Sequence, residues 1–154
     1  MGENGLPVEG GCLCGQVRFR VNAPPMLTMA CHCRGCQQLT SSAFSLSAMF
    51  PSESVEVIQG EPVLGGLHRE DVHQFYCPNC KGWLFTRPQQ ATWFVNVRTT
   101  LLDEPRWTTP FADMFVSEKV DWVATPAQHS FPRFPELDAF RGLMEAYQAQ
   151  AAAT

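Results

Sequence analysis

Several features that define large protein classes are missing from these 154 residues. No apolar run reaches the roughly 20 residues that a membrane-spanning helix needs. The 11 lysines and arginines are scattered and are outnumbered by 15 acidic residues, so a phosphate-binding surface is not expected. The opening residues, MGENGLPVEGG, lack the basic start and apolar core of a secretory signal, and Leu6 breaks a myristoylation motif. We therefore expect a cytoplasmic protein with neither nucleic acid nor membrane as a partner, and the sequence leaves its oligomeric state open.

The composition is that of a folded globular chain. Hydrophobic residues make up 45% of the sequence and charged residues 17%, a balance unlike that of disordered segments, which combine low hydrophobicity with high charge. A chain of this length can bury a core of its own, and the sequence contains neither an internal repeat nor an interdomain linker. The sequence therefore predicts a single domain over residues 1–154.

Alternation of apolar and polar residues predicts a mainly β protein. Val17, Phe19 and Val21 alternate with Arg18 and Arg20, which is the pattern of a half-buried strand. Further short strands, often separated by Gly, Pro, Asn or Asp, are predicted at 44–50, 55–58, 74–76, 83–86, 92–97, 114–116 and 122–124. Many short strands joined by turns are typical of antiparallel sheets.

One long helix is predicted near the end of the chain, over residues 136–150. Its apolar residues recur at helical spacing, at Leu137, Phe140, Leu143, Met144 and Tyr147. A proline at position 135 stands just before them, where helices often begin. The alanine-rich residues 149–154 are expected to fray, and a short helical turn is expected after the cysteine at position 36.

The seven cysteines fall into three tight groups: a CxC, a CxCxxC and a CxxC. The groups are Cys12 and Cys14; Cys31, Cys33 and Cys36; and Cys77 and Cys80. An odd number of cysteines at such spacings, without an export signal, favours metal ligands over a disulfide framework. Thiolates one or two residues apart in a tight turn suit the tetrahedral coordination of zinc.

The simplest division of these cysteines gives two zinc ions per chain, one bound by four thiolates and the other by three. The CxC and the CxxC together would form a closed site, which is typical of structural zinc. The CxCxxC would form a site with a free fourth position, as catalytic zinc sites have. A different partition stays open, in which His32, His68 or His73 supplies a fourth ligand. Because His32 lies between two ligands, we expect its side chain to point away from the zinc and to make an outer hydrogen bond or packing contact.

The stretches around these cysteines resemble the glutathione-dependent formaldehyde-activating enzymes, a family that includes centromere protein V. The matching segments, in chain order, are GGCLCGQVRFRV, CHCRGCQQLTSSAF, FYCPNCKGWLF, VNVRTTLLD and FVSEKVDWV. They span roughly residues 8–135. On this resemblance, that part is the core of the domain and residues 136–154 are a C-terminal helix and tail.

The resemblance implies a β-tent fold of antiparallel sheets with two zinc sites and a short C-terminal helix. It also implies a ligand set for each zinc. The structural zinc would be bound by Cys12, Cys14, Cys77 and Cys80, and the catalytic zinc by Cys31, Cys33 and Cys36. This assignment agrees with the division into four and three ligands that coordination chemistry favours.

As an activity, the resemblance implies a carbon–sulfur lyase similar to S-(hydroxymethyl)glutathione synthase. Its small-molecule partners would be a glutathione-like thiol and a small aldehyde such as formaldehyde. An open zinc can bind a thiol as thiolate or polarise a carbonyl, and either role favours reversible hemithioacetal chemistry. The alternative is a non-catalytic zinc-binding module, or a thiol or metal sensor, of the same fold.

Overall fold

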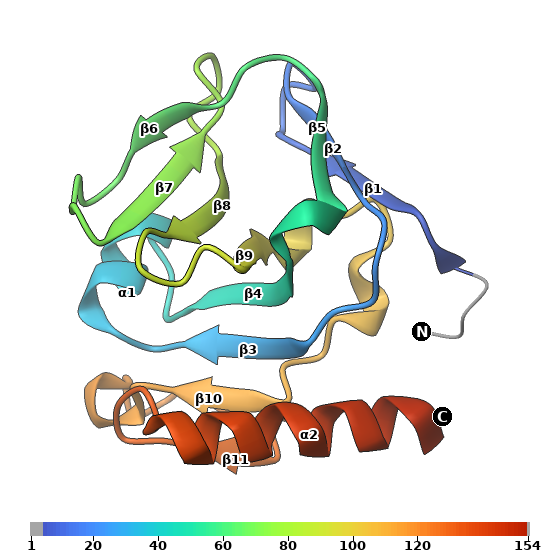
Figure 1. Cartoon of the computed structure of the whole chain (residues 1–154). Coiled ribbons are helices and arrows are strands. Elements are labelled where there is room, and N and C mark those ends of the chain that lie inside the picture. The colour runs from blue at the N-terminus through green and yellow to red at the C-terminus, as the bar shows by residue number, and fades with distance from the viewer. Residues whose placement is uncertain (1–4, 154) are drawn as a thin grey trace.

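The computed structural model describes residues 5–153, which form a mainly β protein with a long C-terminal helix (Figure 1). The strands are β1 (Val8–Gly11), β2 (Arg18–Val21), β3 (Leu27–Cys31), β4 (Ser45–Pro51), β5 (Val55–Gln59), β6 (Val63–Gly65), β7 (Val72–Tyr76), β8 (Trp83–Pro88), β9 (Phe94–Arg98), β10 (Ala112–Met114) and β11 (His129–Ser130). The helices are α1 (Arg34–Thr40) and α2 (Leu137–Ala153), with 3-10 turns η2 (Ser52–Ser54), η3 (Thr99–Leu101), η4 (Pro105–Trp107) and η5 (Val116–Glu118). In this part of the chain, no helix is long and apolar enough to cross a bilayer.

The described strands form two sheets. β1, β2 and β5 form a three-stranded antiparallel sheet. The remaining strands form an eight-stranded sheet in the order β11-β10-β3-β4-β9-β8-β7-β6. Helix α2 lies below β10 in the view of Figure 1, and α1 lies at the opposite end of β3 from the small sheet.

The prediction of purely antiparallel sheets is wrong at one edge of the large sheet, at β10 and β11. β10 pairs in parallel with both β3 and β11, so the large sheet is mixed. Alternation of residue types shows which side chains are buried but not in which direction a strand runs. The parallel register places Asp113 opposite Ala30 and Met114 opposite Cys31, so β10 ends beside the CxCxxC loop.

Most predicted elements are present within a few residues, but the strand predicted at 122–124 is wrong. That segment lies in a turn, where Trp122 is 80% exposed. β1 and β3 were not indicated by alternation; in β3, the four residues 27–30 are all buried, so apolar residues do not alternate with polar ones. The predicted C-terminal helix is confirmed, and it continues through Ala153 instead of fraying at residue 149.

Two hydrophobic clusters hold these layers together. The first lies between the small sheet and the middle of the large sheet, and includes the fully buried Phe19, Val21, Phe50, Leu84, Val95 and Val97. The second attaches α2 to β3, β4 and β10 through Leu27, Met49, Met114, Phe140 and Leu143. Together the clusters cover both faces of β4, because Phe50 belongs to the first cluster and Met49 to the second.

Candidate metal centres

Two hairpin turns carry a cluster of four cysteines. The turn Cys12–Gly15 connects β1 to β2, and the turn Cys77–Cys80 connects β7 to β8. Backbone hydrogen bonds close both turns, since Gly15 N–H donates to the Cys12 carbonyl at 3.0 Å and Lys81 N–H donates to the Cys77 carbonyl at 3.1 Å. The turns meet although 63 residues separate Cys14 from Cys77.

The four sulfur atoms of these turns are spaced as ligands of one tetrahedral metal ion. Cys12 Sγ lies 3.5 Å from Cys14 Sγ, and Cys14 Sγ lies 3.7 Å from Cys77 Sγ. All four sulfurs, including that of Cys80, lie within 4.8 Å of one another. Zinc–sulfur bonds of about 2.3 Å at tetrahedral angles would separate the sulfurs by about 3.8 Å. The cluster could therefore hold a metal ion, and its spacing fits zinc.

The protonation states of these thiols differ because their surroundings differ. A hydrogen bond from the Asn79 side chain lowers the pKa of Cys14 to about 6. Burial raises the pKa of Cys77, which is fully enclosed, to about 11. The Cys12 sulfur accepts a backbone hydrogen bond from Val17 at 3.3 Å. Four thiolates this close repel one another, so a bound cation would be needed to keep them all ionised.

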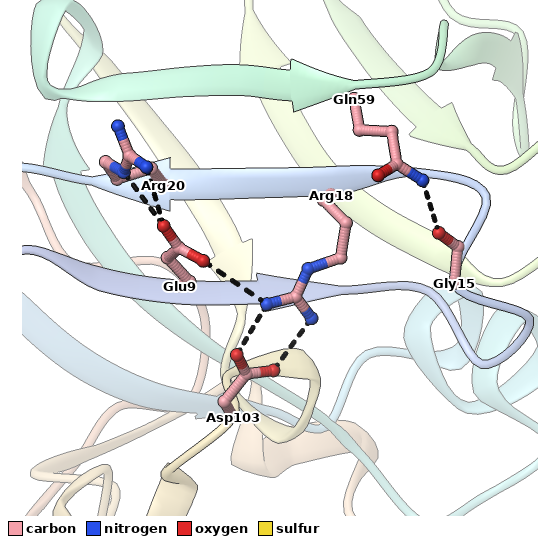
Figure 2. Close-up of polar contacts among 6 residues, drawn as sticks. All are labelled: Glu9, Gly15, Arg18, Arg20, Gln59 and Asp103. Carbon is pink, nitrogen blue, oxygen red and sulfur yellow. Dashed lines mark hydrogen bonds and ion pairs between the residues drawn. The ribbon is translucent and has the colours of Figure 1, made fainter.

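A polar network on the small sheet holds the first turn in place (Figure 2). The Arg18 guanidinium donates to Asp103 Oδ1 at 2.9 Å and lies 3.5 Å from a carboxylate oxygen of Glu9. The Gln59 amide donates to the Gly15 carbonyl at 2.8 Å, which links the CxC turn to β5. These contacts fix the two strands from which the CxC turn projects.

The CxCxxC motif lies where β3 ends and α1 begins. Cys31 is the last residue of β3, Cys33 caps the N-terminus of α1, and Cys36 lies in its first turn. The Cys33 sulfur accepts a hydrogen bond from the Cys36 N–H at 3.4 Å. The three sulfurs lie within 4.8 Å of one another, and among residues 5–153 no histidine nitrogen joins them at that spacing. This second cluster could also hold a metal ion.

The three thiols of this loop share their protons unequally. The pKa of Cys33 is lowered because the Cys31 and Cys36 thiols donate hydrogen bonds to its sulfur. The pKa of Cys31 is raised because its proton is held by Cys33 and Cys36 and because the side chain is largely buried. Without a cation the loop therefore stabilises one thiolate and keeps protons on its neighbours. A bound metal ion would stabilise all three thiolates together.

His32 points away from the sulfur cluster and into the protein. Its side chain is fully buried, and Nε2 lies 3.0 Å from Oδ1 of Asp113, at ion-pair distance but without the alignment of a hydrogen bond. The other carboxylate oxygen of Asp113 accepts a hydrogen bond from Thr125 at 2.7 Å. The Phe44 ring packs against the imidazole at 5.4 Å between centroids. The His32 side chain therefore lies on the side of the loop away from the three sulfurs. Its position between two cysteines predicts this orientation.

Gln37 and Glu118 fix the other side of the loop. The Gln37 amide donates to the backbone carbonyls of His32 at 2.7 Å and Glu118 at 2.9 Å. The Glu118 carboxylate accepts from the Arg34 N–H at 3.0 Å, and Arg34 in turn donates to Gln37 Oε1 at 2.9 Å. Arg34 therefore makes local contacts in the loop. These bonds hold the start of α1 against the segment after β10.

The other two histidines considered as ligands lie outside both clusters. His68 is exposed and has a left-handed backbone (φ +50°), and His73 is half-buried in β7. The loop that carries His68 still comes close to the CxCxxC motif. A side-chain carbon added at Gly35 would lie 3.4 Å from Leu67 Cδ1.

A pocket of about 400 Å³ lies at the C-terminal end of α1; none of the three cysteines lines it, but Ser45, which does, is the β4 residue paired with Cys31. Thr40, in α1, lines it and donates a hydrogen bond to the Cys36 carbonyl at 2.8 Å. Ser45, Tyr76, Trp83 and Arg98 line the pocket with polar groups. Sequence reasoning missed this lining, above all Arg98, because these residues come from α1, β4, β7, β8 and β9 and share no local motif.

Comparison with known proteins agrees with this arrangement. The chain matches the family described as "Glutathione-dependent formaldehyde-activating enzyme" over residues 7–118. A Penicillium rubens protein bearing that family's name is 29% identical over 145 residues, which is 90% of this chain and 71% of the relative. A crystal structure of a Rhodobacter sphaeroides protein shares the fold at a TM-score of 0.51 and 17% identity, covering 62% of this chain and 87% of the other. The chain belongs to the glutathione-dependent formaldehyde-activating enzyme family.

Proposed function

We propose that this chain is a zinc-dependent carbon–sulfur lyase of the S-(hydroxymethyl)glutathione synthase type, built as a single domain over residues 1–154. In this proposal the two zinc ions have different tasks. The structural zinc is bound by Cys12, Cys14, Cys77 and Cys80, and the catalytic zinc by Cys31, Cys33 and Cys36. The observation that carries the proposal is a three-sulfur cluster with no histidine in it. A pocket of about 400 Å³ approaches the cluster through Ser45, the β4 residue paired with Cys31.

The reaction joins a thiol to an aldehyde and can run in both directions. A zinc ion in the three-cysteine loop would favour the thiolate form of the substrate and polarise the aldehyde carbonyl. The thiol sulfur forms a bond to the carbonyl carbon, the π electrons move to the oxygen, and the proton lost by the thiol ends on that oxygen. No oxidant or reductant is needed. The reverse reaction breaks the same carbon–sulfur bond.

Tyr76 is suited to bind the aldehyde oxygen. Its side chain lines the pocket, and its hydroxyl is enclosed and has no hydrogen-bond partner among residues 5–153. Burial raises the pKa of Tyr76, so its proton is retained at neutral pH and can be donated in a hydrogen bond. The Arg98 guanidinium acts to lower that pKa and a charge on Cys36 to raise it, so Tyr76 lies within electrostatic reach of both.

Exchange spectroscopy tests the activity directly. Glutathione and ¹³C-formaldehyde form S-hydroxymethylglutathione without a catalyst, so the measurement is the added exchange rate between free and hydroxymethylated thiol. We expect the zinc-loaded protein to accelerate this exchange and Cys33→Ser to abolish the acceleration. Arg87→Met is a matched control, because Arg87 lies on β8 but does not line the pocket. We expect it to exchange like the unchanged protein.

Metal analysis separates the enzyme from the alternative. We expect two zinc ions per chain in the unchanged protein and one in Cys33→Ser, which should remain folded. A protein that binds two zinc ions but leaves the exchange rate unchanged would contradict the lyase proposal. Such a result would favour a thiol or metal sensor instead.

A further inference from the structure

Arg98 is a buried cation that no Asp or Glu among residues 5–153 pairs with. It is the last residue of β9, and its side chain projects from the face opposite Val95 and Val97, which lie in the first hydrophobic cluster. Arg98 is only 8% exposed, and its guanidinium makes no hydrogen bond or ion pair with any of residues 5–153. Buried arginines are normally paired with a carboxylate, so this one calls for an explanation.

Aromatic packing fixes the position of the guanidinium. Its central carbon lies 4.0 Å from the centroid of the Trp83 ring. Trp83 is in turn nearly parallel to Tyr76, with an interplanar angle of 11° and 6.2 Å between ring centroids. A guanidinium stacked on an aromatic face keeps its nitrogen donors in a defined plane. Nε is enclosed, so a ligand entering the pocket meets the terminal nitrogens.

The pocket around Arg98 offers donors and no negative side chain. Its charged lining residues are Arg98 and Lys81, and none of its lining residues is Asp or Glu. The enclosed indole Nε1 of Trp83 and the hydroxyl of Tyr76 also lack a partner within residues 5–153. An ionised carboxylate is a pure acceptor that matches such a set.

We infer that this pocket binds a carboxylate of the substrate thiol through the guanidinium of Arg98, so that the protein selects anionic thiols over neutral ones. The inference rests on the proposed function for the role of the sulfur cluster. It adds a specificity-determining residue that the cysteine motifs do not indicate. Burial lowers the pKa of Arg98 only to about 10, so the side chain keeps its charge at neutral pH.

A different role for Arg98 predicts a different result. A negative charge on the sulfurs of Cys36 and Cys31 would raise the pKa of Arg98, so the guanidinium could serve only to balance the charge of the metal-loaded sulfur cluster. Loss of Arg98 would then weaken metal retention and the binding of every thiol equally. Recognition of a carboxylate predicts instead a loss confined to anionic thiols.

The test compares 3-mercaptopropionate, which ends in a carboxylate, with 3-mercapto-1-propanol, which has the same carbon chain but ends in a neutral hydroxymethyl group, by titration calorimetry on the zinc-loaded protein. We expect the carboxylate to bind at least about tenfold more tightly, as a charge-assisted hydrogen bond to a buried arginine allows. Arg98→Met should bring this ratio close to one, and Arg98→Lys should reduce it, because lysine keeps the charge but loses the planar fork. Arg87→Met, which removes an arginine over the Phe85 ring on the neighbouring strand, should leave the ratio unchanged.

A second measurement needs neither a thiol nor the metal of the CxCxxC loop. Butyrate should shift the indole N–H signal of Trp83 in a ¹⁵N–¹H titration of the unchanged protein, and the shift should vanish in Arg98→Met. Equal affinity for the two thiols, an equal loss of both in Arg98→Met, or a Trp83 signal that butyrate leaves in place would each overturn the inference. The butyrate result stands even if Arg98→Met fails to fold.

The two proposals fail in distinguishable ways. If the protein discriminates between the thiols but does not accelerate the exchange, the carboxylate site is supported and the lyase proposal is refuted. If the protein accelerates the exchange equally with both thiols, the lyase proposal is supported and the carboxylate site is refuted.

Discussion

Replacing one cysteine of the four-sulfur cluster should destabilise the whole fold. Cys77 is fully buried, and the cluster joins two hairpins that are distant in the sequence. Cys14 of the first hairpin and Cys77 of the second are 63 positions apart. A cross-link that closes a loop of this length stabilises the folded state by about 4 kcal/mol in the chain-entropy treatment. Cys77→Ser removes a ligand and with it this cross-link. For a chain of this size we expect the melting temperature to fall by about 8–16 °C.

Thermal melting followed by far-ultraviolet circular dichroism measures this change, with zinc content determined on the same samples. Cys33→Ser is the matched control, because it makes the same replacement in a cluster whose three sulfurs come from one six-residue stretch. That site closes only a short loop, so its loss should lower the melting temperature far less. A Cys77→Ser protein that loses one zinc ion and melts within about 3 °C of the unchanged protein would refute the structural assignment.

Three further predictions concern separate parts of the molecule. Stepped chelation should remove the metal of the CxCxxC loop first, with about one zinc per chain lost while the circular dichroism spectrum is unchanged; simultaneous loss of both metals and of the fold would contradict this. Asp113→Ala leaves buried His32 without the carboxylate 3.0 Å away, so chemical unfolding should show a loss of about 1–3 kcal/mol with the four-cysteine zinc retained. Asp103→Asn should change the unfolding free energy by less than about 1 kcal/mol at pH 7, because the Arg18 pair is exposed to solvent. The Arg18 hydrogen bond lowers the pKa of Asp103, so this small stabilisation is present above the unfolded pKa of about 3.9 and lost as pH falls through the folded value, and unfolding curves at pH 7 and pH 2.5 should show it.

The cysteine clusters could be foreseen because their information is local. Each CxC, CxCxxC or CxxC segment fixes sulfur spacing within one turn, and coordination chemistry then limits how the segments combine. The strands were foreseen where one face is buried, as in β2, where Phe19 and Val21 are enclosed and Arg18 and Arg20 are half-exposed. The pattern failed in β3, whose residues are covered on both faces.

The lining of the pocket could not be foreseen for the opposite reason. Arg98 follows Val95 and Val97 in an alternating strand, so its sequence position is that of an ordinary solvent-facing arginine. It is buried because Trp83, from the preceding strand, covers its guanidinium. Pairing between strands and the packing of one side chain on another decide this burial, and neither is visible in a local pattern.

The direction of β10 links the sheet to the chemistry of the CxCxxC loop. Because β10 runs parallel to β3, both strands end at the same edge of the sheet, and the residues that follow them meet there. Met114 of β10 accepts a hydrogen bond from the His32 N–H at 2.9 Å, and one Gln37 amide bridges the carbonyls of His32 and Glu118. All three sulfurs of the loop come from one short segment, so their geometry depends on what lies behind that segment. An antiparallel β10 would begin at this edge, and the segment carrying Glu118 would leave from the opposite end, beyond the reach of Gln37.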